Sequence, residues 1–311
     1  MSLKILLTST SFQDTPGSHH ELLENTGYAI TKLRGPLEEK VMLSVIDKFD
    51  AIICGDDEIT KAVIEKGVNS RLKVISKYGS GLDKIDLDAA KAFNLPVSNC
   101  PAVNQTTVAE HVFALLLSYV KNIIPEHEYV QEARWKRLIG KDIGGKTLGV
   151  MGTGNVGKEV IKRGLAFGMN ILAFDKFPNH EFSSQHGITY AASAEEIYQK
   201  SDIITLHIYL DNDSRNLINK KAISAMKKGI IIVNTARAEL VKKSDLLDEI
   251  ESGKIGGYLT DVLEKEPIEE QHPYLNNPKI VITPHIGSRT YENVVKQGTM
   301  AVQNLINQLS L

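Results

Sequence analysis

Residues 147–157 place a short apolar strand directly before glycines at positions 152, 154 and 157. In such a turn the first glycine permits the tight bend, the second lets backbone N–H groups approach a pyrophosphate, and the third lets the next helix pack closely on its strand. The spacing predicts a helix from about Asn155, with its positive N-terminal end facing the phosphates. The turn therefore predicts a parallel α/β fold that binds a dinucleotide.

A second apolar strand, residues 170–174, leads into Asp175, 18 residues beyond Gly157. An acidic side chain at this place accepts hydrogen bonds from the ribose hydroxyls of the adenosine and repels a 2′-phosphate, so it favours NAD over NADP. Lys176 follows and weakens that repulsion. A bare GxGxxG also arises as a chance turn, but an acidic residue at this spacing argues against that interpretation.

Composition limits the classes of function. The chain has 311 residues, 42% of them hydrophobic, which suits two domains with packed cores. Acidic and basic residues nearly balance, 38 against 36, and the basic ones are dispersed, so we expect a small-molecule ligand and no nucleic acid. Cys54 and Cys100 form no CxxC motif, which indicates neither a disulfide framework nor a metal site.

The same considerations predict a reduced, cytoplasmic setting without a membrane partner. The apolar run at the N-terminus is typical of a first strand and is too short for a signal peptide. The longest apolar stretch, residues 112–120, is far below the length of a membrane span.

Strand and helix patterns alternate along the first hundred residues. Strands are expected at 3–8, 28–33, 50–54, 73–78 and 95–98, with helices at about 18–26, 37–47, 58–66 and 86–93. This alternation predicts a parallel α/β domain ahead of the glycine turn. Residues 106–124 predict one long, largely apolar helix that ends just before Pro125. It either bridges two domains, buries a face against a partner subunit, or is a plain core helix.

The second half predicts a complete dinucleotide-binding domain. Strands are expected at 147–151, 170–174, 202–207, 230–234, 256–260 and 279–282. A last helix, 289–309, is expected to pack back on the first domain. We therefore predict two doubly wound parallel-sheet domains: a Rossmann NAD-binding domain, 103–286, inserted in a flavodoxin-like substrate-binding domain, 1–102 and 287–311.

Three polar residues follow predicted strands of the second half: Arg237, Glu266 and His285. Ligands bind at such strand ends in open α/β sheets. The guanidinium of Arg237 can hold a carboxylate and polarise the adjacent carbonyl. The ring of His285 can exchange the hydroxyl proton, and Glu266 can orient the ring and favour its protonated form. The set suits a 2-oxo/2-hydroxy acid pair.

Each of these residues, taken singly, has an ordinary structural alternative. Arg237 can cap its strand, Glu266 lies in an acidic loop of a kind that is usually solvated, and a histidine after a proline is more often structural than catalytic. Together, and in this order after a nucleotide-binding turn, the three residues support the catalytic interpretation more strongly than any one of them does alone.

In these motifs the chain resembles the D-isomer-specific 2-hydroxyacid dehydrogenase family over essentially its whole length. Within that family its sequence is most similar to the phosphoglycerate dehydrogenase branch. The resemblance rests on six blocks in family order: YGSGLDKID at 78–86, NCPAVNQTTVAE at 99–110, GTGNVG at 152–157, NTAR at 234–237, DVLEKEP at 261–267 and TPHIG at 283–287.

The resemblance implies an NAD-dependent oxidoreductase with Arg237, Glu266 and His285 as catalytic set. It implies that backbone N–H groups of Ser80 and Gly81, together with Arg237, hold the substrate carboxylate. It further implies a homodimer joined through its cofactor domains. The implied cofactor-binding residues are Thr107, Gly152, Gly154, Asn155, Val156, Gly157, Asp175, His207, Thr235, Ala236, Asp261 and Gly287. Trp135 is interpreted as interface or core packing.

Two departures leave the substrate open. Many relatives carry a proline soon after the histidine that matches His207, where this chain has Ile208 and Tyr209. The loop 54–58 contains three consecutive acids, which are expected to repel a phosphate, whereas phosphoglycerate-using relatives often place a basic residue near there. The substrate is therefore a 2-hydroxy or 2-oxo acid, with 3-phosphoglycerate among the candidates. Because the chain stops at Leu311, we expect no C-terminal regulatory domain.

Three other functions compete with a dehydrogenase of this kind. A non-catalytic NAD-sensing protein can share the fold and even the catalytic residues. Formate or phosphite oxidation is disfavoured because formate-oxidising relatives pair the histidine with glutamine, where this chain has Glu266. A methyl-transfer Rossmann protein can use the glycine turn and Asp175 but has no need of Arg237 or His285.

Overall fold

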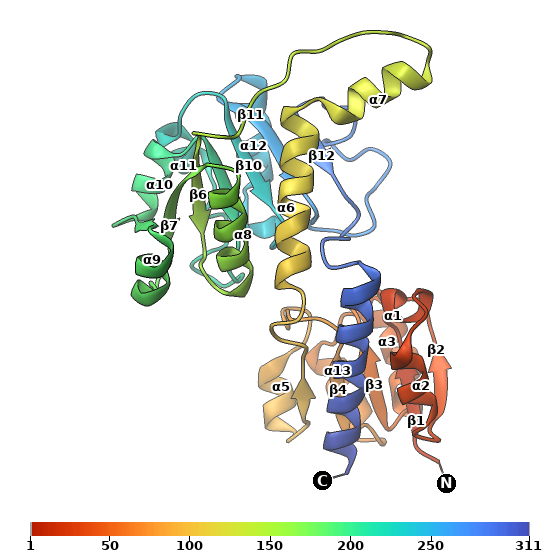
Figure 1. Cartoon of the computed structure of the whole chain (residues 1–311). Coiled ribbons are helices and arrows are strands. Elements are labelled where there is room, and N and C mark those ends of the chain that lie inside the picture. Colours follow the sequence, from red (N-terminus) through yellow and green to blue (C-terminus); the bar gives the residue numbers. More distant parts are fainter. Residues whose placement is uncertain (1, 311) are drawn as a thin grey trace. The chain divides into compact units, whose positions relative to one another are not determined.

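The computed structural model describes residues 2–310 and divides the chain into two α/β units (Figure 1). Unit 1 comprises Met1–Asn104 and Arg289–Leu311, and unit 2 comprises Gln105–Ser288. Each unit is built on one sheet in which every strand pair is parallel. The expected fold class, two doubly wound parallel-sheet domains, is confirmed.

The sheet of unit 1 has the order β2-β1-β3-β4-β5, the flavodoxin-like arrangement. Its strands are β1 (Lys4–Leu7), β2 (Ala29–Lys32), β3 (Ala51–Cys54), β4 (Val74–Lys77) and β5 (Val97–Ser98). The central strands β3 and β4 are buried along their whole length, because helices cover both faces of the sheet. All five strands lie where the alternation predicted them.

Two groups of helices cover the faces of this sheet. Helices α1 (Thr10–Asp14), α2 (Ser18–Glu24) and α13 (Tyr291–Leu309) pack on one face, and α3 (Glu39–Val45), η1 (Ile46–Lys48), α4 (Lys61–Val68) and α5 (Leu87–Ala92) on the other. Helix α13 buries Val294, Ala301 and Leu305 against β3 and β4, so the C-terminal helix returns to the first domain as expected. Only α1 was not predicted, since five residues are too few to show a helical period.

The sheet of unit 2 has the order β12-β11-β10-β9-β6-β7-β8. Read from the other edge, with β6 as strand 1 of the unit, this order is 3-2-1-4-5-6 followed by one further strand. It is the strand order of dinucleotide-binding domains. The strands are β6 (Thr147–Met151), β7 (Asn170–Phe174), β8 (Thr189–Tyr190), β9 (Ile203–Leu206), β10 (Ile230–Asn234), β11 (Ile255–Thr260) and β12 (Ile280–Ile282). Six of them were predicted, and the two-residue edge strand β8 was missed.

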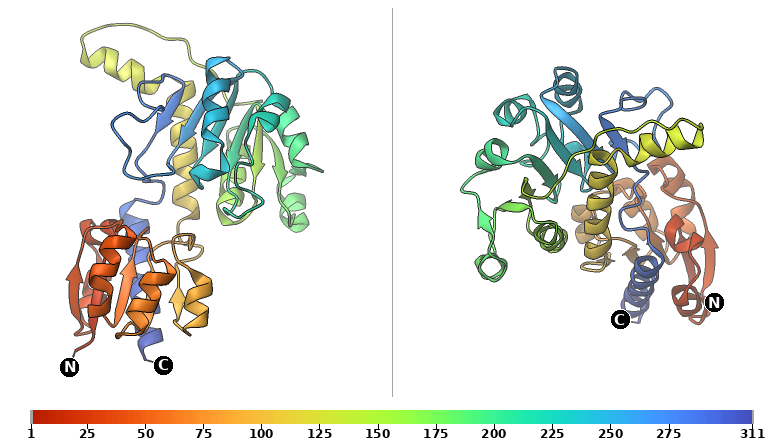
Figure 2. Two further views of the ribbon diagram at one scale, coloured as in Figure 1. Left: turned by 180° about the vertical axis from the view of Figure 1, so that it is seen from behind. Right: turned by 45° about the horizontal axis from the view of Figure 1, so that its top comes forward.

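Helices again form two layers, which Figure 2 shows from two further sides. Helices α6 (Gln105–Val120), α8 (Asn155–Ala166) and α9 (His180–His186) pack on one face of the sheet. Helices α10 (Ala194–Lys200), α11 (Lys220–Ala225) and α12 (Lys243–Glu251) pack on the other, and the short η2 (Ala238–Leu240) follows β10. The helices thus cover the two faces of the sheet, which leaves the carboxyl ends of the strands for the site.

The single helix predicted for residues 106–124 is wrong at its end. Helix α6 stops at Val120, Asn122 takes a left-handed conformation with φ of 56°, and α7 (Ile123–Gln131) continues at an angle of 61°. Pro125 lies in the first turn of α7, where no intrahelical N–H is needed, so it does not end a helix here.

Helix α6 buries Val112, Phe113 and Leu116 in the core of unit 2, which supports the core-helix alternative. Trp135 follows α7 and is 79% exposed, so the interpretation of it as core packing is wrong. Among the described residues no single helix is both long and apolar enough to cross a membrane; α6 and α7 meet that standard only as a bent pair.

Candidate active site

The glycine turn joins β6 to α8 as predicted. Gly152 has φ of +94°, and a Cβ there would lie 2.4 Å from the carbonyl oxygen of His207. A Cβ on Gly157 would lie 2.0 Å from the carbonyl oxygen of Gly152. A Cβ on Gly154 meets nothing within 4 Å, so the turn is open above this glycine, where a pyrophosphate approaches. The helix begins at Asn155 with Gly154 as N-cap, as the spacing predicted.

Asp175 lies just beyond β7 and is tied to the glycine turn. Its Oδ2 accepts hydrogen bonds from the backbone N–H and the hydroxyl of Thr153, at 2.6 and 3.0 Å, and its Oδ1 accepts one from the N–H of Phe177 at 2.8 Å. The hydroxyl of Tyr190 donates to Thr153 Oγ1 at 2.8 Å. Lys176 pairs with Asp213 at 3.1 Å. The carboxylate is therefore oriented before any ribose reaches it.

His207 follows β9 and lies behind the glycine turn. Its backbone N–H donates to Met151 O at 2.7 Å, and its Nε2 lies 2.9 Å from the hydroxyl of Thr205. Desolvation of the ring lowers the pKa of His207 to about 3. The ring is therefore neutral throughout the physiological range.

The segment 234–237 turns sharply after β10. The fully buried Asn234 accepts from the N–H of Ala236 at 3.1 Å and donates through Nδ2 to the carbonyl oxygen of Arg237 at 2.8 Å. The guanidinium of Arg237, in turn, donates to Ala236 O at 2.7 Å. The hydroxyl of Thr235 is buried and makes no hydrogen bond among the described residues. An orphaned buried hydroxyl beside the turn fits a cofactor that supplies its partner.

His285 and Glu266 form the predicted pair. His285 Nδ1 donates to Glu266 Oε2 at 2.8 Å, and Glu266 Oε1 accepts from the N–H of Leu263 at 3.0 Å. The two side chains are 36% and 30% exposed, so the pair is reachable from solvent. His285 has φ of +54°, a sparsely populated region for a non-glycine residue. Such an outlier is typical of a functional position.

Asp261, after β11, anchors the segment that carries His285. Its Oδ1 accepts from the hydroxyl of Thr283 at 2.6 Å and from the N–H of Ile286 at 2.9 Å, and its Oδ2 accepts from the N–H of Gly287 at 2.7 Å. Burial alone raises the pKa of this carboxyl, but hydrogen bonds from His111, Thr283 and Ile286 outweigh it and leave the pKa of Asp261 lowered. The anchor is therefore an ionised carboxylate.

Ser80 and Gly81 belong to unit 1, in the loop after β4. Asn99 donates to Ser80 O at 2.7 Å, and the N–H of Cys100 donates to Gly79 O at 2.8 Å. Because the carbonyl groups of Gly79 and Ser80 both accept hydrogen bonds from residues 99–100, the loop is held in place after β4. All the other predicted site residues, Thr107 at the start of α6 included, lie in unit 2.

The three acidic residues of loop 54–58 make hydrogen bonds or ion pairs within unit 1. Asp57 is buried and accepts from Thr8 Oγ1 and from two backbone N–H groups, at 2.5 to 2.9 Å. Glu58 accepts from the N–H of Glu39 at 2.9 Å. Asp56 pairs at 2.7 Å with the buried ammonium group of Lys77. Each of the three acids therefore has a partner within unit 1, and burial raises the pKa of Asp57.

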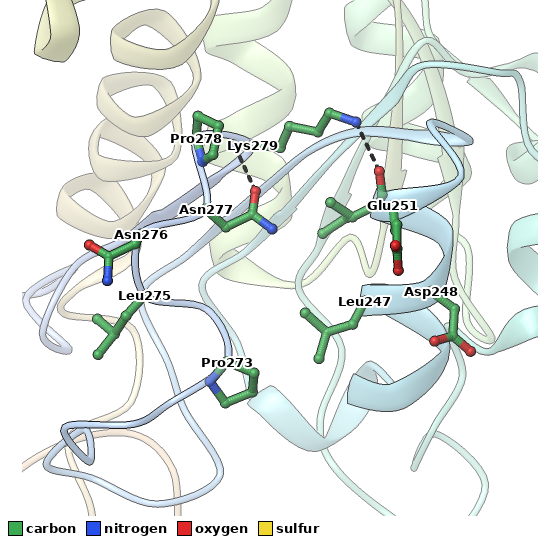
Figure 3. Close-up of a pocket in the computed structure, with 10 residues that line it drawn as sticks. Leu247, Asp248, Glu251, Pro273, Leu275, Asn276, Asn277, Pro278 and Lys279 are labelled. Atoms are coloured by element: carbon green, nitrogen blue, oxygen red, sulfur yellow. Dashed lines mark hydrogen bonds between the residues drawn. The ribbon is translucent and has the colours of Figure 1, made fainter.

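The site residues of unit 2 share the carboxyl edge of its sheet, where β6, β7, β9, β10, β11 and β12 end. A surface hollow lies elsewhere, between α12 and residues 273–279, and Figure 3 shows Leu247, Glu251 and Lys279 among its lining. It adjoins the start of β11 and β12, at the amino edge, and contains none of the predicted site residues. The hollow is therefore not the candidate active site.

Sequence reasoning missed three polar partners in unit 2: His111, Thr283 and Tyr190. His111 Nε2 lies 2.8 Å from Thr283 Oγ1 and 3.4 Å from Asp261 Oδ1. A polar residue one turn after Thr107, on a largely apolar helix, was the available signal for His111. Tyr190 lies on the short strand β8, so no pattern marked it.

Comparison with known proteins agrees with the resemblance that the sequence motifs indicated. Residues 113–287 match the family model described as D-isomer specific 2-hydroxyacid dehydrogenase, NAD binding domain. A hydroxypyruvate reductase of Thermotoga maritima is 35% identical and aligns over 88% of this chain and 90% of its own. A D-3-phosphoglycerate dehydrogenase of Methanocaldococcus jannaschii is 33% identical over 97% of this chain but only 57% of its own. The chain thus spans little more than half of the latter relative.

Solved structures agree with this assignment. The TT0316 protein of Thermus thermophilus superposes with a TM-score of 0.88 at 31% identity, covering 99% of this chain and 97% of that one. A D-lactate dehydrogenase of Aquifex aeolicus, crystallised with NAD and lactic acid, superposes with a TM-score of 0.85 at 28% identity, covering 98% and 95%.

Proposed function

Since the chain belongs to the D-isomer-specific 2-hydroxyacid dehydrogenase family, we propose that it interconverts a short, unphosphorylated 2-oxo acid and its D-2-hydroxy acid. The chain is an NAD-dependent oxidoreductase, and the resemblance drawn from its motifs is confirmed. The relatives are named for hydroxypyruvate, glyoxylate and 3-phosphoglycerate, so the family alone leaves the acid open. Hydroxypyruvate is our first candidate, because the hydroxypyruvate reductase aligns with this chain over 90% of its own length.

The pair of His285 and Glu266 carries the proposal. With Nδ1 bonded to Glu266, proton exchange with the substrate oxygen falls to Nε2 of His285. The carboxylate favours the imidazolium form, which donates the proton when a 2-oxo acid is reduced. Bound NADH supplies the hydride, and the protein supplies position and charge.

Arg237 is assigned to the substrate carboxylate. Its planar guanidinium can bind a carboxylate through two parallel hydrogen bonds. The side chain of Asn234 bonds to the main chain of Arg237, so the guanidinium of Arg237 extends from a turn that is held in place. A phosphorylated acid needs a further free cation, and in unit 1 the buried ammonium group of Lys77 is already bonded to Asp56 and Gly55 O.

Substitution of His285 by alanine tests the mechanism. Loss of a general acid removes about 100- to 10,000-fold of the rate, so kcat should fall by that range while NADH binding, followed by fluorescence titration, is retained. A matched Glu266→Gln variant keeps the shape of the partner and should lose less. An alanine variant as active as the parent protein contradicts the assignment of His285.

A panel of 2-oxo acids decides the substrate. NADH oxidation is followed with hydroxypyruvate, glyoxylate, pyruvate and phosphohydroxypyruvate, and kcat/KM should be highest for one of the unphosphorylated acids. Preference for phosphohydroxypyruvate overturns our choice within the family. Tight NADH binding without turnover of any acid instead favours the NAD-sensing alternative.

We also propose a homodimer formed through the arm that follows α6. Across α7 and the next residues, large apolar side chains are exposed: Ile123, Ile124, Val130, Trp135 and Ile139. Exposed apolar groups of this kind mark association surfaces. Light scattering should give twice the chain mass for the parent protein and a monomer for Ile139→Glu; a monomeric parent protein would contradict the proposal.

A further inference from the structure

His111 connects helix α6 to the segment that carries His285. Its Nε2 lies 2.8 Å from Thr283 Oγ1 and 3.4 Å from Asp261 Oδ1. The side chain is largely buried, 15% exposed, and Asp261 is 3% exposed. We call these three residues, all within unit 2, the His111 clasp.

The direction of the hydrogen bonds follows from the donors present. The hydroxyl of Thr283 has one proton, which it donates to Asp261 Oδ1 at 2.6 Å. Thr283 Oγ1 must therefore accept from the ring, so Nε2 of His111 carries a proton. The ring also lies against Gly287, where an added Cβ would be 3.5 Å from His111 Cδ2 and 2.8 Å from Asp261 Oδ2.

The clasp holds the backbone on both sides of His285. Thr283 lies two residues before it, and Ile286 and Gly287, whose N–H groups donate to Asp261, follow it. His285 has φ of +54° and donates its own N–H to Thr283 O at 3.0 Å. A non-glycine residue in this conformation is strained and persists only where neighbouring contacts impose it.

We propose that His111 is a positioning residue for His285, acting through Thr283 and Asp261. The inference rests on the proposed role of His285. Without the Nε2–H donor, Thr283 loses the bond that orients its hydroxyl, and Asp261 keeps only part of the set that stabilises its charge. The segment 283–287 then samples conformations in which the His285 ring is displaced, and a displacement of about 1 Å can cost about 100-fold in rate.

The competing explanation is that His111 merely stabilises the fold. Tyr119 offers a matched control, because it lies on the same helix and also bonds to β11: its hydroxyl donates to Gly256 O, at the start of that strand. Tyr119→Phe removes one bond between α6 and β11 far along the sheet from His285. It should lower stability as His111 variants do, without touching the segment 283–287.

The experiment compares His111→Leu, His111→Gln and Tyr119→Phe. Hydrogen exchange of a peptide covering 283–288 is measured in the cofactor-free protein by mass spectrometry, and the melting temperature is recorded beside it. With NADH and the best 2-oxo acid, kcat, KM and the isotope effect of NADH deuterated at C4 are determined. NADH affinity is measured by fluorescence.

For His111→Leu we expect exchange of the Ile286 and Gly287 amides to rise about tenfold, in line with the loss of about one hydrogen bond. We expect kcat to fall about 10- to 100-fold, with NADH affinity within about threefold of the parent value and a larger isotope effect. His111→Gln keeps an N–H donor and should recover most of both losses. Tyr119→Phe should leave exchange of this peptide and kcat unchanged.

Two results overturn the inference. One is His111→Leu with parental exchange at 283–288; the other is Tyr119→Phe with losses equal to those of His111→Leu, which assigns His111 to stability alone. Exchange is read without substrate or cofactor, so it judges the clasp even if no 2-oxo acid is turned over. Absence of turnover in the parent protein counts against the proposed function, and not against the clasp.

Discussion

The carboxyl edge of the unit 2 sheet has two halves that are built differently. The nucleotide half, at the ends of β6, β7 and β9, consists of the glycine turn, Asp175 and His207. The proton-relay half, at the ends of β10, β11 and β12, consists of Arg237, Glu266, His285 and the His111 clasp. The geometry of the nucleotide half is set by a backbone turn that has no room for side chains. The geometry of the proton-relay half is set by hydrogen bonds that side chains make.

The difference lies in which contacts decide the geometry. In the nucleotide half, Cβ atoms on Gly152 and Gly157 would lie within 2.4 Å of carbonyl oxygens, so the absence of side chains sets the turn. In the relay half, the conformation of His285 depends on the hydrogen bond that its ring donates to Glu266 and on the one that the backbone N–H of Ile286 donates to Asp261. We therefore expect steric changes to break the first half and loss of single donors to degrade the second.

Gly157→Ala is expected to have the largest effect. Its Cβ would lie 2.0 Å from Gly152 O, a distance that backbone must relieve by moving. Displacement of the turn should weaken NADH binding about 100-fold or more and lower the melting temperature, because overpacking typically costs about 1–3 kcal/mol. Fluorescence titration and thermal unfolding measure the two effects.

Gly154→Ala is the matched control for this change. A Cβ at Gly154 meets nothing within 4 Å, and its φ of −67° suits any residue, so the melting temperature should stay at the parent value. NADH binding should still weaken, since the methyl group enters the space of the pyrophosphate. If Gly157→Ala binds NADH normally, the turn is not set by steric exclusion and the contrast between the halves fails.

These two halves also differ in how far the sequence predicts them. Gly152, Gly154, Gly157 and Asp175 lie at fixed spacings within one β–α–β unit, so the fold, the cofactor and the strand order follow from local pattern. Asp261 and Thr283 each directly follow a strand, but only Asp261 was named as a site residue. His111, however, meets Thr283 across 172 residues of chain, and no spacing encodes that contact.

The misses have physical reasons of the same kind. The helix boundary near Pro125 was wrong because a proline in the first turn of a new helix resembles one that follows a helix. The repulsion of a phosphate by the acids at 56–58 stays a prediction, but no pattern showed their partners, Thr8 and Lys77 among them, which the fold brings to them. Patterns show which groups are present, and the fold decides what each one faces.

A pH titration of stability tests the nucleotide half further. The pKa of His207 is lowered to about 3 by desolvation, whereas an unfolded histidine titrates near 6.5. Between these values the unfolded chain binds the extra proton, so the contribution of His207 is complete above pH 6.5 and is lost as pH falls. The loss amounts to about 2 kcal/mol at pH 5.

His207→Gln should remove this component, so its free energy of unfolding should fall less steeply from pH 7 to pH 5 than that of the parent protein. Urea unfolding is best followed by circular dichroism, because the single tryptophan, Trp135, is 79% exposed. Burial also lowers the pKa of His19 in unit 1, so a slope remains in both proteins. Identical slopes would show that His207 accepts a proton in the folded state.

Tyr190→Phe is expected to have the smallest effect, and it probes whether side chains matter at all in the nucleotide half. The hydroxyl of Tyr190 donates to Thr153 Oγ1, but the backbone N–H of Thr153 still binds Asp175 at 2.6 Å in its absence. The KM for NADH should therefore rise only about two- to threefold, with kcat unchanged, in keeping with a net hydrogen-bond contribution of about 0.5 kcal/mol. Tyr198→Phe is the control, because the hydroxyl of Tyr198 is buried without a hydrogen-bond partner among the described residues. A rise of 100-fold for Tyr190→Phe would mean that the turn depends on a side-chain network as the relay half does, and the two halves would then follow one rule.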